Sequence, residues 1–516
     1  YYFQKNERLP QYQVEAVLKK KLAGLATVEC HLGWSAHNVT QDDDMARVTI
    51  VEQGGTGNEV LEADYIIGCD GAHSTVREQI GIKCDGADFD QLMVLAVFRS
   101  RELHEHLQRF PERSTYRIMH RDLKGYWQFF GRIDVGEGWF FHAPVPADTT
   151  KDNYDFHSLL QKVAGFEFAC EFDHVGFWEL RVVVAEEYRS GRVFIAGDAA
   201  HSHPPYGGYG LNNGLEDAAN LGWKLAATFE GWGGDELLRT YGEERYPVFK
   251  ETGDDFITAR IRTDREFFDR YNPEDDPVEF ARAWKQHEAE VVPRMLTYEP
   301  HYEGSPIICG PPGGASGAHG MHTFAAKPGH HLPPQLLSSG GNVYEELGHG
   351  FTLLAFDFED DTTLAFEHAA AVLGVPLKII VDTFEGGRDA YESRLIFVRP
   401  DQYDLQQTFH LLEIPPEPRR ERIGPINPQA SPSRDVFARR FGITRPFEIV
   451  PIIGQRAVEI RCSVKFFPVE LEPVLVPVSH RTSPGIQPPR ILQHLPVIGQ
   501  FKTKMSPYPL AHYCSG

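Results

Sequence analysis

The chain has 516 residues and a net charge of −22, and its length predicts about three or four domains. No stretch approaches the roughly 18 consecutive apolar residues of a membrane span, and a strongly acidic chain repels phosphate backbones. We therefore expect neither a membrane span nor a nucleic-acid partner. The seven cysteines are scattered, without a CxxC pair, which predicts reduced thiols in a cytoplasmic protein.

A helix followed by strands is predicted at the start of the chain. Apolar residues at four-residue spacing indicate a helix over residues 9–23. Three runs of strand-forming residues follow, at Thr27–Thr40, Ala46–Gln53 and Glu59–Gly68. The turn-rich sequences QDDD and GGTGN separate these runs, a pattern that is typical of a β-meander.

The sequence DYIIGCDGAHSTVREQIGI, residues 64–82, contains the first motif that can carry chemistry. A buried strand ends at Asp70 and Gly71, where the Asp70 carboxylate can fix the backbone donors of a tight turn. Arg77 follows and can meet a pyrophosphate. Taken alone, the motif is more simply a helix capped by Ser74 with a surface arginine.

Residues 91–180 are predicted to form an antiparallel sheet with one buried face. The sequence GYWQFFGRIDVGEGWFFHAPV indicates a hairpin of Tyr126–Arg132 and Gly138–Val145. For any single aromatic residue in this sheet, the hydrophobic core is the more common place. The candidate substrate contacts in the hairpin are Trp127, Phe129, Trp139 and Phe141.

The longest motif is a strand, a glycine-rich loop and a helix over residues 191–229. Asp198 closes the strand, and its carboxylate can accept hydrogen bonds from a polyol. Glycines in the loop let a flat ligand approach the backbone, and the helix expected from Leu211 directs its positive dipole end at that ligand. A glycine loop alone is weak evidence, because a simple turn has the same composition. The apolar stripe of the helix is predicted to be Leu211, Leu215, Ala218, Gly222, Leu225 and Phe229.

The C-terminal part changes in character near residue 404. Before it, FTLLAFD, the helix Thr362–Leu373 and LKIIVDT form a βαβ pattern that favours a parallel strand pair. The absence of CxxC excludes dithiol redox work in this unit. After it, prolines are frequent and the charge balance turns positive, so we expect a poorly ordered tail over 404–516.

Taken together, DGAHSTVRE and GDAAHSHPPYGGYGLNNGLEDAANLGWKLA resemble the two FAD signatures of flavin-dependent aromatic hydroxylases, the p-hydroxybenzoate hydroxylase and phenol 2-monooxygenase group. The resemblance implies an α/β multi-domain fold. A Rossmann-like FAD-binding domain would use 1–90 and 181–300, and the substrate-binding sheet, 91–180, would be inserted in it. A thioredoxin-like domain would follow at 301–403, with a structural role in which homodimer contact is left open.

The resemblance also implies roles for individual residues. Asp198 would bind the ribityl chain of FAD, and Pro205 would lie near the reactive edge of the flavin. Tyr206 and Tyr209 would orient or deprotonate a phenol substrate. The implied cofactor contacts are Gln11, Asp70, Gly71, Arg77, Gly197, Asp198, Pro205, Gly208, Gly210, Leu211 and Asn212.

The implied reaction joins a small aromatic substrate and O2. NAD(P)H would reduce FAD, O2 would add to give a C4a-hydroperoxide, and one oxygen atom would pass to a phenolic or polyketide-like aromatic. No metal is expected, because the motif histidines His73, His201 and His203 lack the spacing of a ligand set.

The sequence departs from the family at its beginning. The strand, GxGxxG loop and helix that bind the ADP half of FAD are absent, and residue 1 is Tyr. We therefore expect an N-terminally truncated monooxygenase whose affinity for FAD is weak or lost. Two alternatives remain: a non-catalytic remnant that binds a partner, and a flavin-dependent epoxidase or Baeyer–Villiger-type oxygenase.

Overall fold

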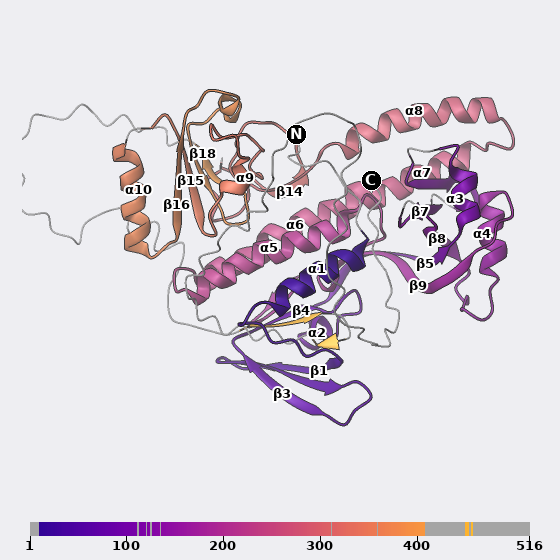
Figure 1. Cartoon of the computed structure of the whole chain (residues 1–516), viewed down its shortest axis with the longest axis horizontal. Coiled ribbons are helices and arrows are strands. Elements are labelled where there is room, and N and C mark those ends of the chain that lie inside the picture. The colour runs from indigo at the N-terminus through magenta and orange to yellow at the C-terminus, as the bar shows by residue number, and fades with distance from the viewer. Residues whose placement is uncertain are drawn as a thin grey trace, which may run out of the picture.

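The computed structural model describes residues 10–407, except 111–112, 120, 124–125, 135, 311 and 359, together with 449–453 and 456–457. These residues form a mixed α/β structure in which sheets surround two long helices, α5 (Tyr209–Phe229) and α6 (Asp235–Glu251) (Figure 1). The tail predicted to be poorly ordered lies outside the described residues, apart from 404–407 and the two short segments after 448.

The sheet that carries the first motif has eight strands in the order β10-β11-β4-β19-β20-β1-β2-β3. The predicted helix 9–23 is α1 (Gln11–Ala23), and the β-meander is present. The single strand predicted over Glu59–Gly68 is wrong, because β3 pairs with β2 whereas β4 pairs with β11 and β19. The strands are β1 Trp34–Gln41, β2 Ala46–Glu52, β3 Asn58–Ala63, β4 Tyr65–Cys69, β10 Arg189–Ser190, β11 Val193–Ile195, β19 Ile449–Ile453 and β20 Arg456–Ala457.

The second sheet is antiparallel, in the order β12-β9-β5-β8-β7-β6. It contains the predicted hairpin as β7 and β8, but both of its faces are buried rather than one. Helices α3 and α4 cover one face, and residues that follow α6 cover the other. The elements are β5 Cys84–Arg99, α3 Arg101–Leu107, β6 Thr115–Met119, β7 Trp127–Arg132, β8 Gly138–Val145, α4 Phe156–Ala164, β9 Glu171–Ala185 and β12 His201–Ser202.

Helices α5 to α8 follow one another along the chain. A π-helical turn, Thr252–Thr258, joins α6 to α7 (Ala259–Arg270). Asp276 caps α8 (Pro277–Met295) by accepting hydrogen bonds from two backbone N–H groups, and proline suits the first helical position because it needs no hydrogen-bond partner there. None of the described helices is long and apolar enough to cross a membrane.

The C-terminal sheet has the strand order β16-β15-β17-β18, and α10 lies along one side of it (Figure 1). The predicted parallel pair is confirmed as β15 and β16. Strand β18 pairs with β17, so the sheet continues past the boundary that we set at 404. The elements here are β13 Tyr298–Tyr302, β14 Ser316–His319, α9 Val343–Glu346, β15 Phe351–Phe356, α10 Asp360–Leu373, β16 Leu377–Asp382, β17 Leu395–Val398 and β18 Asp404–Gln407.

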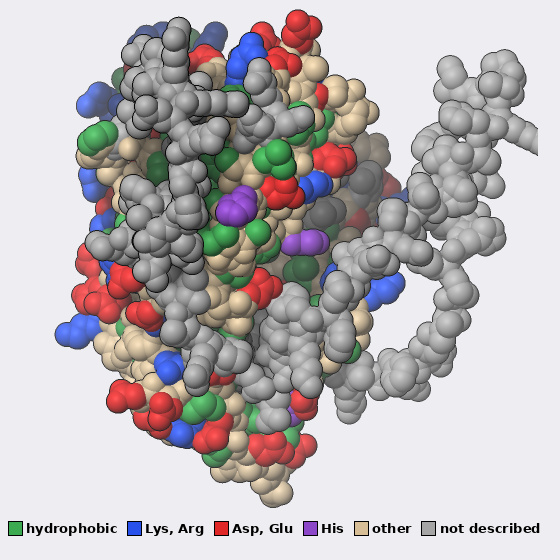
Figure 2. All heavy atoms as spheres, turned by 90° about the vertical axis from the view of Figure 1, so that its left-hand side faces the viewer, with side chains coloured by type: hydrophobic (Ala, Val, Ile, Leu, Met, Phe, Trp, Pro, Cys, Tyr) green, Lys and Arg blue, Asp and Glu red, His purple; other side chains and the backbone are tan. Residues whose placement is uncertain are grey.

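The surface reflects the acidic composition. On the face seen in Figure 2, acidic side chains are scattered widely, and basic side chains occur singly or in small groups. The described residues seen on this face therefore form no extended basic surface of the kind that binds nucleic-acid backbones.

Candidate functional site

The two sequence motifs meet at the parallel pair of β4 and β11, where Gly68 is in register with Ile195. Each strand leads at its carboxyl end directly into a motif loop, and in open α/β sheets ligands bind at that end of the strands. Arg77 joins the loops: its Nη1 donates to the Ala199 carbonyl at 2.7 Å and its Nη2 to the Ala72 carbonyl at 3.0 Å. The candidate site is therefore one place, built from segments far apart in sequence.

The loop after β4 is fixed by the Asp70 carboxylate, as the sequence predicts. Its Oδ1 accepts a hydrogen bond from the Ser74 hydroxyl at 2.5 Å, and its Oδ2 accepts one from the Val76 N–H at 3.0 Å. Ser74 also caps α2 (Thr75–Gln79). Gly71 has φ +86°, a left-handed conformation that favours glycine.

The loop after β11 brings glycine backbone against the start of α5. Gly197 has φ +59°. A Cβ added to Gly214 of α5 would lie 3.5 Å from the Cα of Gly197. The left-handed Gly208 (φ +75°) is the N-cap of α5, which has no side-chain cap and no acidic residue in its first turn. The helix begins at Tyr209, two residues before the predicted start.

This helix start fits the electron-rich edge of a flavin, because backbone N–H groups and the helix dipole both favour negative charge there. Gly210 and Leu211 are half-buried in this first turn, and Asn212 is exposed. The half-buried Asp198 lies in the preceding loop. In α1, the Gln11 Oε1 is buried without a hydrogen-bond partner among the described residues.

The other loop residues form a buried wall. Pro205, Tyr206 and Tyr209 are all buried. Burial raises the pKa of Tyr206 well above its usual value, and the Asp264 carboxylate acts in the same direction. The Tyr209 ring packs 4.5 Å from that of Tyr298, so Tyr209 contributes to the core of the molecule.

Three of the four aromatic candidates of the hairpin have described side chains, and the alternation of the sheet separates them. Phe129 shares a hydrophobic cluster with Tyr206 and Tyr209. Trp139 and Phe141 are fully buried on the opposite face, against α3 and α4. The side chain of Trp127 lies outside the described residues. Of the described three, only Phe129 is on the side of the loop between β11 and α5 (residues 196–208), which we call the flavin loop.

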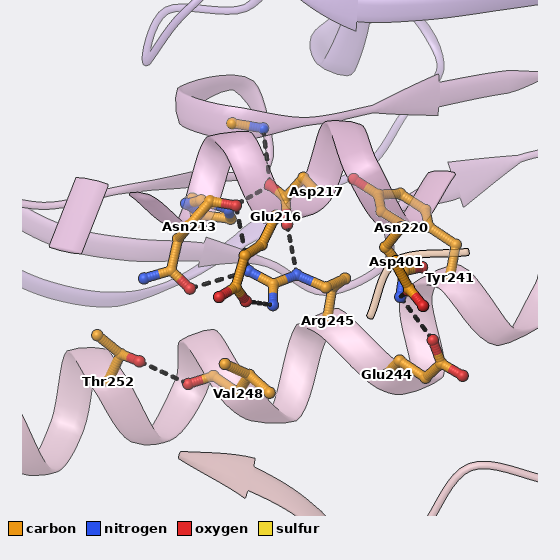
Figure 3. A network of polar contacts seen from close by, with 12 residues as sticks. Asn213, Glu216, Asp217, Asn220, Tyr241, Glu244, Arg245, Val248, Thr252 and Asp401 are labelled. Carbon is orange, nitrogen blue, oxygen red and sulfur yellow. Dashed lines mark hydrogen bonds and ion pairs between the residues drawn. The ribbon is translucent and has the colours of Figure 1, made fainter. Parts of the chain in front are cut away.

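A buried polar network contacts the loop after β11 (Figure 3), and it was not predicted from the sequence. Asp217 on α5 accepts a hydrogen bond from the Gly197 N–H at 2.9 Å and pairs with His201 Nε2 at 2.6 Å. Arg245 on α6 donates its Nε to Asp217 at 2.7 Å. Burial alone would raise the pKa of Asp217, but the charges of His201 and Arg245 hold it well below its usual value. The network thus anchors the flavin loop to both long helices.

The predicted apolar stripe of α5 is confirmed at Leu225 and Phe229, which are buried in the core, but not in the middle of the helix. Leu215 is 48% exposed, and Ala218 and Gly222 are exposed. Among the residues that α5 buries are the polar side chains Asn213, Asp217, Asn220 and Lys224. The prediction is wrong at Leu215, Ala218 and Gly222, because α6 supplies charged partners to the polar side chains that α5 buries instead.

Comparison with known proteins agrees with this geometry. The family model described as "FAD binding domain" matches residues 3–255. The chain is 38% identical over 250 residues to 12-dehydrotetracycline 5-monooxygenase/anhydrotetracycline 6-monooxygenase of Streptomyces rimosus, covering 46% of this chain and 48% of that protein. It is 29% identical over 442 residues to 4-methyl-5-nitrocatechol 5-monooxygenase of a Burkholderia species, covering 79% and 76%.

A solved structure is similar over most of the chain. The rebeccamycin biosynthetic enzyme RebC with reduced flavin has a TM-score of 0.63 at 28% identity, covering 73% of this chain and 71% of RebC. The chain spans about half the length of the first curated relatives that it matches. Residues 3–255 match the FAD-binding family model, and the named relatives are monooxygenases, so the comparisons support the flavin-dependent aromatic hydroxylase family with FAD as cofactor.

Proposed function

We propose that this chain is an FAD- and NAD(P)H-dependent monooxygenase that hydroxylates a phenolic or polyketide-like aromatic. The observation that carries the proposal is the meeting of the two motif loops with the glycine-led N-terminus of α5. Relatives named for tetracycline and nitrocatechol substrates support an aromatic ring that carries hydroxyl groups. When bound, FAD would supply the redox chemistry between NAD(P)H, O2 and that ring.

The residues of the chain would bind, orient and exclude water. Asp198 would hold the ribityl chain, and the first turn of α5, through Gly210 and Leu211, would stabilise negative charge on the flavin. Asp70, Gly71 and Arg77 would serve the pyrophosphate side, although in the structure both terminal nitrogens of Arg77 bind carbonyls. The remaining contacts would come from Gln11, Gly197, Pro205, Gly208 and Asn212.

On the substrate side, Tyr206 and Phe129 would form the wall that excludes water. Because burial raises the pKa of Tyr206, its phenol stays protonated and would orient a substrate hydroxyl as a hydrogen-bond donor or acceptor. It would not remove the substrate proton. Trp139 and Phe141 leave the set of proposed substrate contacts, because they pack on the far face of the sheet.

The domain assignment is part of the same proposal. The FAD-binding domain would comprise 1–90 and 181–300, with the substrate sheet at 91–180 inserted in it. The βαβ unit within 301–403 would be a thioredoxin-like domain and a contact in a homodimer. The parallel pair of β15 and β16 supports the thioredoxin-like assignment.

We propose further that FAD affinity is weak, because these 516 residues contain no GxGxxG loop for the ADP phosphates. The test is to express these 516 residues and measure their bound-flavin absorbance, then their NADPH consumption with added FAD against panels of phenols and ketones. Tight stoichiometric FAD would contradict weak affinity. NADPH consumption stimulated by ketones and not by phenols would contradict the proposed hydroxylase activity. Complete failure to bind FAD would favour the alternative of a non-catalytic remnant that binds a partner.

A further inference from the structure

Three metal-ligating side chains gather outside the flavin loops, at the end of β13. His301, Glu303 and His330 each offer a ligand atom, and these atoms lie within 4.8 Å of one another. His301 and His330 form an antiparallel β-bridge, and their rings stack with centroids 4.8 Å apart at an angle of 8°. The backbone therefore holds the two imidazoles side by side.

Hydrogen bonds orient the central ring. His330 Nδ1 lies 3.0 Å from a Glu299 carboxylate oxygen, and its Nε2 lies 2.9 Å from a Glu303 oxygen. Glu299 is itself fixed, because it accepts a hydrogen bond from the His322 N–H at 2.6 Å. Two carboxylates thus share one imidazole, which leaves net negative charge even when that ring carries both protons.

The second ring contributes an unused group. His301 Nδ1 is buried and has no hydrogen-bond partner among the described residues. A buried polar atom of this kind is uncommon, because leaving it without a partner costs about 1–3 kcal/mol. It lies in the residue that completes the ligand set.

We propose that His301, Glu303 and His330 bind a divalent transition-metal ion, with zinc as the best fit. Two imidazoles and one carboxylate, with a fourth position for water, form a common zinc environment. Glu299 would hold His330 through Nδ1, the usual carboxylate support of a metal-binding histidine. The ion would take the place of the proton between His330 Nε2 and Glu303, and that proton would leave to solvent.

Binding requires one imidazole to rotate, because the two rings are nearly parallel at 8° and each nitrogen lone pair lies in the plane of its ring. The changes in distance are smaller. Tetrahedral zinc bonds of about 2.1 Å place ligand atoms about 3.4 Å apart. The 2.9 Å contact of His330 with Glu303 would lengthen, and the wider separations, up to 4.8 Å, would shorten.

The ion would have a structural role. It would fasten β13 to the segment that leads into the C-terminal sheet. Strand β13 also carries Tyr298, whose hydroxyl accepts a hydrogen bond from Asn213 of α5 at 3.0 Å. The ion would therefore stabilise strand β13, which contacts α5, without taking part in the flavin chemistry.

The test is titration of the purified full chain with Co2+, which reports tetrahedral nitrogen and oxygen ligands by visible absorption, followed by displacement with Zn2+. We expect one ion per chain and an intense visible band. His301→Ala and Glu303→Gln should each weaken binding at least tenfold, and Glu299→Gln about 10–100-fold. The matched control is His319→Ala, because His319 also pairs with a carboxylate, Asp255 at 3.0 Å, but lies outside the ligand set.

Two outcomes would overturn the proposed site. The first is that the wild-type chain shows no visible band, or only the weak band of six-coordinate Co2+. The second is that the ligand variants bind Co2+ as tightly as His319→Ala does. The three ligand residues and Glu299 would then form only an ion-pair cluster. If Glu303→Gln does not fold, the wild-type spectrum and His301→Ala still decide the question.

Discussion

Tyr206 illustrates at the residue scale how burial decides what a side chain can do. Sequence reasoning gives this phenol two roles, to orient a substrate hydroxyl or to remove its proton. Burial raises the pKa of Tyr206 well above its usual value, because the phenolate is poorly solvated inside the protein. Orientation is the role that this environment permits.

We expect Tyr206→Phe to leave the pH dependence of catalysis unchanged. A group with a raised pKa stays protonated across the working range, so its removal deletes no ionisation from the profile. The loss of one hydrogen bond should weaken substrate binding roughly 2–10-fold. Substrate-stimulated NADPH oxidation between pH 6 and 10 measures both effects, with Tyr209→Phe as the control. A limb that disappears from the profile would identify Tyr206 as the base.

At the element scale, α5 contains glycines in two different conformational roles. Gly208 stands in a left-handed conformation at the N-cap, whereas Gly222 is exposed in the helix interior and a Cβ there would meet nothing within 4 Å. The same substitution should therefore act in opposite directions along one helix.

Gly208→Ala should destabilise the fold by about 1–3 kcal/mol, because alanine is strained at positive φ. Gly222→Ala should stabilise it by about 0.5–1 kcal/mol, since alanine loses less conformational entropy in a helix. Urea denaturation monitored by circular dichroism measures both. Equal effects of the two changes would show that the N-cap geometry described here is wrong.

The same helix shows how much the sequence could predict. The motif loops, the hairpin and the parallel pair follow from local patterns, because turn residues and strand periodicity act over a few positions. The buried face of α5 does not, since hydrophobic periodicity assigns Asn213, Asp217 and Lys224 to solvent. Partners outside the helix make their burial favourable, on α6 for Asp217 and Lys224 and on β13 for Asn213. Their recurrence at helical spacing is the signal that could have indicated a polar buried face.

The His301, Glu303 and His330 cluster was missed for a related reason. His330 lies 27 positions from Glu303, so no local spacing marks the three as a ligand set. A β-bridge brings the two histidines together, and neither of them lies in a recognisable motif.

At the scale of the whole molecule, a buried ion cluster joins the C-terminal sheet to the long helices. Arg399, just after β17, donates to both Glu244 oxygens at 2.8 and 2.9 Å. Lys224 donates to the same carboxylate at 2.7 Å, and Asp401 pairs with Arg399 at 2.6 Å. Two positive and two negative groups thus form a neutral cluster between the C-terminal sheet and helices α5 and α6.

Arg399→Ala should cost about 3–5 kcal/mol of stability, because it leaves a buried carboxylate with one cation fewer. Arg394→Ala is the control: its partner Asp357 lies at 3.2 Å, but both side chains are exposed, so we expect a loss of about 0–1 kcal/mol. Thermal and urea unfolding of both variants measure the difference. A small loss for Arg399→Ala would mean that the C-terminal sheet is not fastened by this cluster.

Alkaline pH should destabilise the whole fold. Burial raises the pKa of several tyrosines, while in the unfolded chain they titrate near 10. Above pH 10 the unfolded state therefore releases protons that the folded state retains, and stability falls as pH rises. Urea midpoints at pH 8 and pH 11 test this, with a further rise in tyrosinate absorbance on unfolding, because only the exposed tyrosines ionise in the folded chain. Ionisation of all 20 tyrosines in the folded chain near pH 10 would contradict it. These tyrosines are Tyr188, Tyr206, Tyr241, Tyr298, Tyr302, Tyr391 and Tyr403.

The inserted antiparallel sheet has a consequence for the order of folding. Arg77 and Ala199 are 122 positions apart, and closing so long a loop delays the pairing of β4 with β11. Strands β5 and β9 pair along their length, with Cys84 opposite Ala185, so the insert brings its own two ends together. Once it has folded, only short segments separate β4 from β11. Pulse-labelling hydrogen exchange should then find β5 and β9 protected first, and the flavin loops would be the last part of this region to form.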